Sequence, residues 1–178
     1  MPKMNSTGAL KQQNSVTVIP IPDNQWIAQF NNALPLSNPW PPAVAKNGYV
    51  YVVTPETVGI TKLTPYGALV NSFNCGTSDG AIGRVIAVDK NGNTYVGGGI
   101  PSGASASRLI KYNSSGSIVW QKSFNITTMY VVSIQLTPNN DLFVLINNDT
   151  AGSNTGTLMK INPSNGSIIN QRKLLKYS

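Results

Sequence analysis

Short apolar stretches alternate with polar turns along most of the chain, and the same order of parts occurs three times, in residues 42–74, 85–125 and 133–175. Each segment has an apolar stretch, a turn, a stretch with an aromatic residue, a variable loop, a stretch with a lysine, a second turn and a last apolar stretch. Val, Ile, Tyr, Phe and Thr favour strands, and Asn-Gly and Ser-Gly favour tight turns. Each segment therefore predicts four antiparallel strands.

The repeat has a regular spacing. Its aromatic residues are 44 and 48 residues apart, at Tyr51, Tyr95 and Phe143. Its lysines are 49 and 49 residues apart, at Lys62, Lys111 and Lys160. Four antiparallel strands at this period have the size of a β-propeller blade, and we interpret the three aromatic residues as repeated core positions.

The second segment carries the most specific pattern, "VIAVDKNGNTYVGG" followed by "RLIKYNSSGSIVWQKSF". It resembles the bacterial β-propeller repeat, in which "AVDxxGNxYVxG" precedes "KYxxxGxxxWxxxF". The resemblance covers nearly all of residues 42–175 and is weakest in the first segment, which lacks counterparts of Asp89 and Trp120. It implies an all-β domain of three four-stranded, propeller-like blades over residues 42–178, and no particular reaction. A compact β-sandwich built from the same hairpins is the alternative.

Residues 1–41 contain six prolines and predict an extended arm. Residues 14–22 predict an edge strand that prolines end. Residues 24–34 have helical apolar spacing but also match the last stretch of the repeat, so we favour a strand while a helix stays open. The arm could dock onto a neighbouring subunit or fold back on its own domain. Its candidate contact residues are Val16, Val18, Ile19, Trp26, Ile27, Phe30 and Trp40.

Three blades are fewer than the four to eight of a closed propeller. An open arc exposes two apolar blade faces, and a large exposed apolar patch marks an interaction site. We therefore expect self-association or packing within a larger protein assembly.

The net charge of the chain limits the possible classes of binding partner only slightly. The net charge is +7, from 13 Lys+Arg and 6 Asp+Glu, and charged residues make up 11% of the chain. The basic ends could attract an acidic surface, or they could simply be solvated. Because no aromatic and basic residues interleave there, nucleic acid is not an expected partner. The chain has no run of about 18 apolar residues, so we do not expect membrane insertion. No apolar signal core is seen near the N-terminus.

Catalytic chemistry has few candidates. The chain has no histidine and one cysteine, Cys75, which excludes His-based triads and His or thiolate metal clusters. No spacing pairs the carboxylates, which are Asp23, Glu56, Asp79, Asp89, Asp141 and Asp149. We expect no enzyme activity, no metal and no cofactor.

The stretch "VIAVDKNGNTYVGGG", residues 85–99, has acidic, amide and glycine residues typical of ligand loops, but it fits neither of two ligand motifs. A calcium loop that starts at Asp89 needs glycine at Thr94 and glutamate at Ile100. A phosphate cradle needs a helix after the three glycines, but "IPSGASAS" follows. The stretch therefore predicts a hairpin whose glycines lead out of the second strand into a loop.

These observations favour a non-enzymatic structural subunit of an extracellular or viral particle, such as a capsid decoration, tail or fibre component. The alternative is a carbohydrate-binding, lectin-like module, in which aromatic rings stack on sugars. Its candidate contact residues are Trp40, Tyr66 and Trp120.

Overall fold

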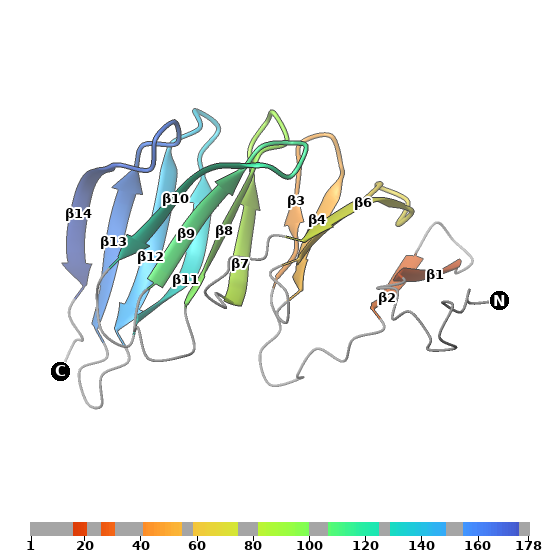
Figure 1. Ribbon diagram of the computed structural model, residues 1–178, viewed down its shortest axis with the longest axis horizontal. Coiled ribbons are helices and arrows are strands. Elements are labelled where there is room, and N and C mark those ends of the chain that lie inside the picture. Colours follow the sequence, from red (N-terminus) through yellow and green to blue (C-terminus); the bar gives the residue numbers. More distant parts are fainter. Residues whose placement is uncertain are drawn as a thin grey trace, which may run out of the picture.

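The computed structural model of the chain is all-β (Figure 1). It describes residues 41–54, 59–74, 82–99, 107–124, 129–148 and 155–174, together with the backbone of residues 16–20 and 26–30. In these residues no helix is long and apolar enough to cross a membrane.

Each sequence repeat forms one four-stranded antiparallel sheet, here called a blade, whose strands pair in chain order. Blade 1 contains β3 (Ala43–Val44), β4 (Val50–Thr54), β5 (Gly59–Leu63) and β6 (Leu69–Asn74). Blade 2 contains β7 (Ile82–Val88), β8 (Thr94–Gly99), β9 (Ser107–Tyr112) and β10 (Ile118–Phe124). Blade 3 contains β11 (Met129–Leu136), β12 (Leu142–Asn148), β13 (Thr155–Ile161) and β14 (Ile168–Leu174).

The predicted turn chemistry is present. Gly92 in the first turn of blade 2 has φ +79° and Gly116 in its second turn has φ +86°, values that strain any residue with a Cβ. The first turn of blade 3 lacks glycine, and Asn140 takes the left-handed conformation with φ 65°. Asparagine tolerates that conformation better than most residues, which explains why "TPNND" still forms a hairpin.

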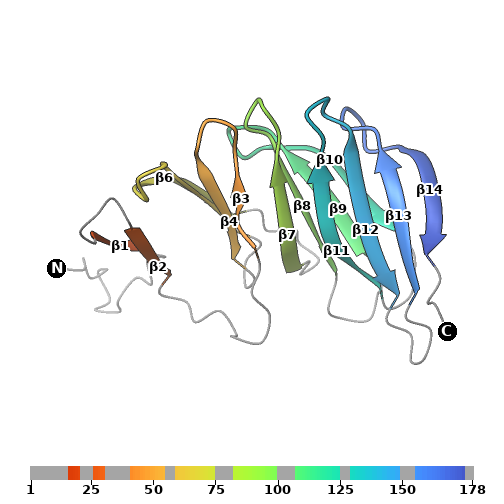
Figure 2. The ribbon, with the colours of Figure 1, turned by 180° about the vertical axis from the view of Figure 1, so that it is seen from behind.

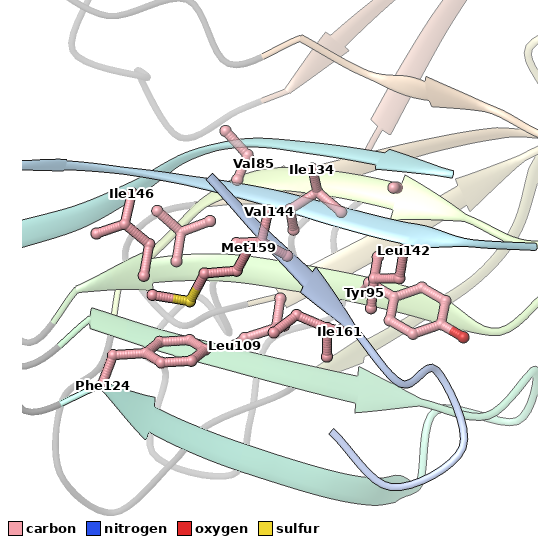
Figure 3. Packing of buried hydrophobic residues seen from close by; sticks show 12 residues of the cluster. Val85, Tyr95, Leu109, Phe124, Ile134, Leu142, Val144, Ile146, Met159 and Ile161 are labelled. Carbon is pink, nitrogen blue, oxygen red and sulfur yellow. The ribbon is translucent and has the colours of Figure 1, made fainter. Parts of the chain in front are cut away.

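The three blades stand side by side in a row, as both views show (Figures 1 and 2). Buried side chains of blades 1 and 2 form one cluster, which includes Tyr51, Ile60 and Ile110. Buried side chains of blades 2 and 3 form another, which includes Tyr95 and Met159 (Figure 3). We call the face of a blade that looks toward the next blade its forward face, and the opposite one its rear face.

The propeller-like prediction is confirmed and the β-sandwich alternative is wrong. A sandwich buries one face of each sheet, whereas blade 2 contributes to both clusters. Its neighbouring residues Leu109 and Ile110 point to opposite faces, and their exposed fractions are 0% and 2%. The strand period of two thus serves two separate interfaces.

Two further strands precede the blades, β1 (Val16–Pro20) and β2 (Trp26–Phe30), and they pair antiparallel. The strand prediction for residues 26–30 is confirmed over the helix. In both views this hairpin lies at the blade 1 end of the row, opposite β14 (Figures 1 and 2). The side chains of the seven candidate arm residues, Trp40 among them, lie outside the described residues.

One local prediction is wrong. Gly97, Gly98 and Gly99 do not lead out of the strand, because they form the second half of β8 and are buried. A Cβ at Gly97 would lie 2.4 Å from Cγ1 of Val131, and one at Gly99 would lie 2.4 Å from the Tyr130 ring. The glycines are there because β11 of the next blade approaches the β8 backbone too closely for side chains.

Candidate functional site

The contact that joins blade 2 to blade 3 centres on one carbonyl group. Lys111 Nζ and Trp120 Nε1, both on blade 2, donate to the carbonyl oxygen of Pro163 at 2.8 Å and 3.1 Å. Gly166, in the same β13–β14 turn, has φ +73°, and a Cβ on it would lie 2.8 Å from the Trp120 ring. The turn is therefore seated on the forward face of blade 2.

A similar arrangement joins blade 1 to blade 2. Gly116 in the β9–β10 turn lies against Phe73 of β6, and a Cβ on it would lie 2.6 Å from the Cγ of that ring. On the same face, Lys62 Nζ lies 5.6 Å from the centre of the Tyr51 ring. In both interfaces the turn between the third and fourth strands of one blade covers an aromatic ring on the last strand of the preceding blade.

The forward face of blade 3 has no such cover among the described residues. Register pairs Phe143, Lys160 and Asn170 across β12, β13 and β14, as it pairs Tyr95, Lys111 and Trp120 in blade 2. Tyr95 and Leu109 are both 0% exposed, whereas Phe143 is only half-buried and Leu158 is 37% exposed. A hollow of about 300 Å³ lies on this face, lined by Phe143, Leu158, Lys160, Asn170, Gln171 and Arg172.

The charges on this open face are partly balanced. Lys160 Nζ lies 2.8 Å from Oδ1 of Asp141 and 5.8 Å from the centre of the Phe143 ring. Arg172 is exposed on the neighbouring strand. The face therefore combines the apolar side chains of Phe143 and Leu158 with one ion pair and one additional cation.

A second hollow, of about 400 Å³, lies among the first turns of the three blades. It is lined by Lys46, Val88, Asp89, Lys90, Leu136, Thr137, Pro138 and Asn140. The side chains of Lys46 and Lys90 are exposed, whereas Asp89 is 5% exposed. Because three consecutive blades meet there, this hollow depends on the stacking of the blades.

The Asp89 carboxylate accepts hydrogen bonds from its own hairpin. Oδ1 accepts from the backbone N–H groups of Asn91 at 2.9 Å and Asn93 at 3.0 Å. Oδ2 accepts from Nδ2 of Asn93 at 2.7 Å and from the hydroxyl of Tyr95 at 3.4 Å. Burial raises the pKa of Tyr95 above its ordinary value, and the Asp89 carboxylate adds to the rise. These bonds fix a hairpin, and no group of three His, Cys, Asp or Glu residues in the described part of the chain could hold a metal ion.

The structure places the predicted core residues and the predicted ligand-contact residue Trp120 in different environments. Tyr51 and Tyr95 are buried, at 3% and 0% exposure, as expected of core positions. Phe143 departs from that expectation and is half-buried, because no described blade covers its side of β12. Trp120, expected as a ligand contact, instead packs against the blade 2–blade 3 core and the Pro163 carbonyl.

The other ligand candidates do not form a site with it. Tyr66 is 84% exposed in the second turn of blade 1, whereas Trp120 belongs to β10 of blade 2. Trp40 lies outside the described residues, as do four of the six carboxylates, Asp23, Glu56, Asp79 and Asp149.

The sequence predicted an exposed apolar face at each end of an open arc, but it did not identify the residues that form the face of blade 3. The signal was present in the repeat, since Asn170 stands where Trp120 stands in blade 2. Without the packing order of the blades, that difference reads as ordinary variation between repeats.

Comparisons with known proteins concern the fold. No family model matches the chain, and no curated protein matches it significantly. Among solved structures, it is similar to a Bacteroides caccae protein of unknown function, with 17% identity, a TM-score of 0.47, and coverage of 82% of this chain and 50% of that one. It is also similar to streptogramin B lyase, with 15% identity, a TM-score of 0.47, and coverage of 79% and 56%. The chain thus spans about half the length of these structures.

Proposed function

We propose that this chain is a non-enzymatic structural subunit that assembles with other protein subunits through the forward face of blade 3. The observation that carries the proposal is the contrast between equivalent positions, since Leu109 is 0% exposed in blade 2 and Leu158 is 37% exposed in blade 3. The same face also exposes 41% of Leu174 at the end of β14. Covering it removes apolar surface from water, at about 25 cal/mol per Å².

The rear face of blade 1 is covered at its centre but exposes apolar side chains nearer its edges, since Val44 is 64% exposed and Leu69 is 49% exposed. Leu63 and Thr61 point away from Tyr51 and Lys62, which pair on the forward face. They are nevertheless 0% and 6% exposed. The two ends of the row therefore differ, which favours a contact between unlike surfaces over one between two copies of the same face.

The setting we propose for this assembly is an extracellular or viral particle, as a decoration, tail or fibre component. The sequence supports it through a chain rich in polar uncharged residues, with 11% charged residues and no histidine. Proteomic mass spectrometry of purified particles from the source should detect the chain as a stoichiometric component, and its consistent absence would remove this setting from the proposal.

The assembly itself is tested by light scattering of the full chain between about 1 and 100 µM. We expect a mass above the 19.0 kDa of one chain, and Leu158→Asp should return it to one chain because it places a charge on the covered face. The matched control is Val119→Asp, since Val119 is also exposed, at 49%, but lies on blade 2. A wild-type chain that stays at 19.0 kDa throughout would refute the proposal.

A carbohydrate-binding role is the second candidate, and one observation favours it. Tyr66 presents 84% of its surface at the tip of a turn, where a ring could stack on a sugar. Calorimetry with a panel of neutral and acidic oligosaccharides should then show binding that Tyr66→Ala abolishes. Absence of heat with every sugar counts against this role.

A further inference from the structure

The first residues of the chain contain a fourth copy of the turn that seats one blade on another. Residues 3–10 read "KMNSTGAL", against "KLTPYGAL" in blade 1 and "KYNSSGSI" in blade 2. Lysine and glycine are five residues apart in these three copies, at Lys3 and Gly8 in the first, and six apart in blade 3, at Lys160 and Gly166. Asparagine and serine follow in the same places in the first and third copies.

The described copies show what this motif does locally. In blade 2, Oδ1 of Asn113 accepts from the backbone N–H groups of Ser115 and Ser117, at 3.1 Å and 2.9 Å. Gly116 then supplies the positive φ. Asn5 and Gly8 occupy the same two places in the first copy, so residues 3–10 have the chemistry to form the same turn.

The described copies also show where such a turn belongs. The turn that contains Gly116 seats on Phe73 of blade 1, and the turn that contains Gly166 seats on Trp120 of blade 2. Each seat is the forward face of the preceding blade. Among the described blades, only blade 3 has a forward face without a described turn on it, and that face carries the hollow beside Lys160 and Asn170.

We propose that residues 3–10 of a second copy of the chain seat on the forward face of blade 3. The carbonyl group of Ser6 then stands where that of Pro163 stands between blades 2 and 3. Lys160 takes the place of Lys111, and the side-chain amide of Asn170 supplies the donor that Trp120 supplies in blade 2. Gly8 supplies the positive φ of the turn, as Gly116 does in blade 2. This inference rests on the proposed function and names the partner and the contact.

A second copy is required by the position of the tether. Residues 11–15 join the motif to β1, and six peptide steps span about 20 Å at full extension. The β1–β2 hairpin lies at the blade 1 end of the row, opposite β14, in both views (Figures 1 and 2). The seat within reach is therefore that of a neighbouring copy. Such a head-to-tail contact either closes into a ring or continues as a filament.

Two measurements on the full chain test this contact. In the first, Gly8→Val should weaken self-association at least about tenfold, because the equivalent glycines Gly67 and Gly116 have φ of +80° and +86°, which strain a β-branched residue. Thr7→Tyr is the matched control and should associate as wild type does, since Ser115, at the equivalent place in the turn that seats on blade 1, is exposed.

In the second, a photo-crosslinking phenylalanine analogue replaces Phe143, which lines the hollow on this face, in an equal mixture of ¹⁴N- and ¹⁵N-labelled chains. We expect mixed-isotope cross-links between position 143 and residues 3–10. Self-association that Gly8→Val leaves unchanged, or cross-links confined to one isotope or to another part of the chain, would overturn this contact while leaving the assembly proposal standing. A chain that is monomeric at every concentration would overturn both.

Discussion

Gly97 shows how a single residue determines the distance between two blades. It lies in the middle of β8, where a glycine normally weakens a strand. Here the missing side chain lets Val131 of β11 reach the backbone. The close approach buries Val131 completely, at 0% exposure, and this burial offsets the lower strand propensity of glycine.

The close approach predicts a sharp difference between two glycine substitutions. Gly97→Ala should lower the free energy of unfolding by about 1–3 kcal/mol, because its Cβ would meet Val131 at 2.4 Å. Gly156→Ala in β13 should be neutral or slightly stabilising, since its nearest contact, Leu145, is at 3.4 Å. Urea unfolding of both variants measures this, and equal effects would contradict the packing explanation.

Tyr95 predicts how stability changes at alkaline pH. Its pKa is raised in the folded state by burial and by the Asp89 carboxylate, so above pH of about 10 the unfolded chain loses this proton while the folded chain keeps it. The contribution of Tyr95 to the free energy of unfolding is complete below that pH. It is lost as the pH rises further, at up to about 1.4 kcal/mol per pH unit.

The variant Tyr95→Phe tests this pH dependence. Urea unfolding between pH 8 and 11.5 should show a shallower decline in stability for Tyr95→Phe than for wild type. Tyr66→Phe, a change to a ring that is 84% exposed, should decline as wild type does. Identical slopes for all three proteins would show that Tyr95 titrates alike in both states.

At the scale of elements, the turn between the third and fourth strands acts as the connector between blades. Its glycine has a positive φ, which shapes the turn, and the absence of a Cβ lets the turn lie flat on an aromatic ring of the preceding blade. One residue therefore serves both the local conformation and the interface.

A double-mutant cycle separates these two roles of Gly166. Gly166→Ala should destabilise by about 1–2 kcal/mol from backbone strain and by more from collision with Trp120. In a Trp120→Ala background only the strain remains, so the two changes should couple by about 0.5–3 kcal/mol. Gly48→Ala, at φ +82° beside Pro65, should add to Trp120→Ala without coupling. If the effects of Gly166→Ala and Trp120→Ala on the free energy of unfolding simply add, the contact between Gly166 and the Trp120 ring contributes no measurable stability.

Across the whole molecule, stability is centred on blade 2. Its two faces belong to two different clusters, and every residue of β8 is buried. Every residue of β14, at the open end of the row, is exposed. The last strand of blade 1 is exposed over residues 69–72 in the same way, so local opening should begin at the outer strands of the two end blades, β6 and β14, and reach β8 last.

Hydrogen exchange at a concentration where the chain is monomeric tests this gradient of local stability. Amides paired between β8 and β9 should exchange slowest, and those of β14 should exchange faster by at least about tenfold. Raising the concentration should slow exchange in β14 if its face becomes covered, with β6 as the internal reference strand. Uniform protection along the row would contradict the gradient.

Much of the fold could be predicted because its causes are local. Glycine at positive φ, strand-forming residues at alternate positions and a constant spacing of Tyr51, Tyr95 and Phe143 together predicted three sheets with the correct strands. The candidate site could not be predicted in the same way. Trp120 read as a surface aromatic until the structure placed Pro163 and Gly166 against it.

By itself, the sequence determined that the chain repeats a four-stranded antiparallel unit, where the turns fall and which residues alternate along each strand. These depend on backbone conformation and side-chain type within a few residues. Only the tertiary structure decided that Gly97 is an interblade contact, that Trp120 is a connector and that Phe143 is half-buried although Tyr95, at the same place in the repeat, is 0% exposed. The physical reason is that burial belongs to a pair of surfaces. Equivalent residues differ when one has a blade packed on it and the other does not.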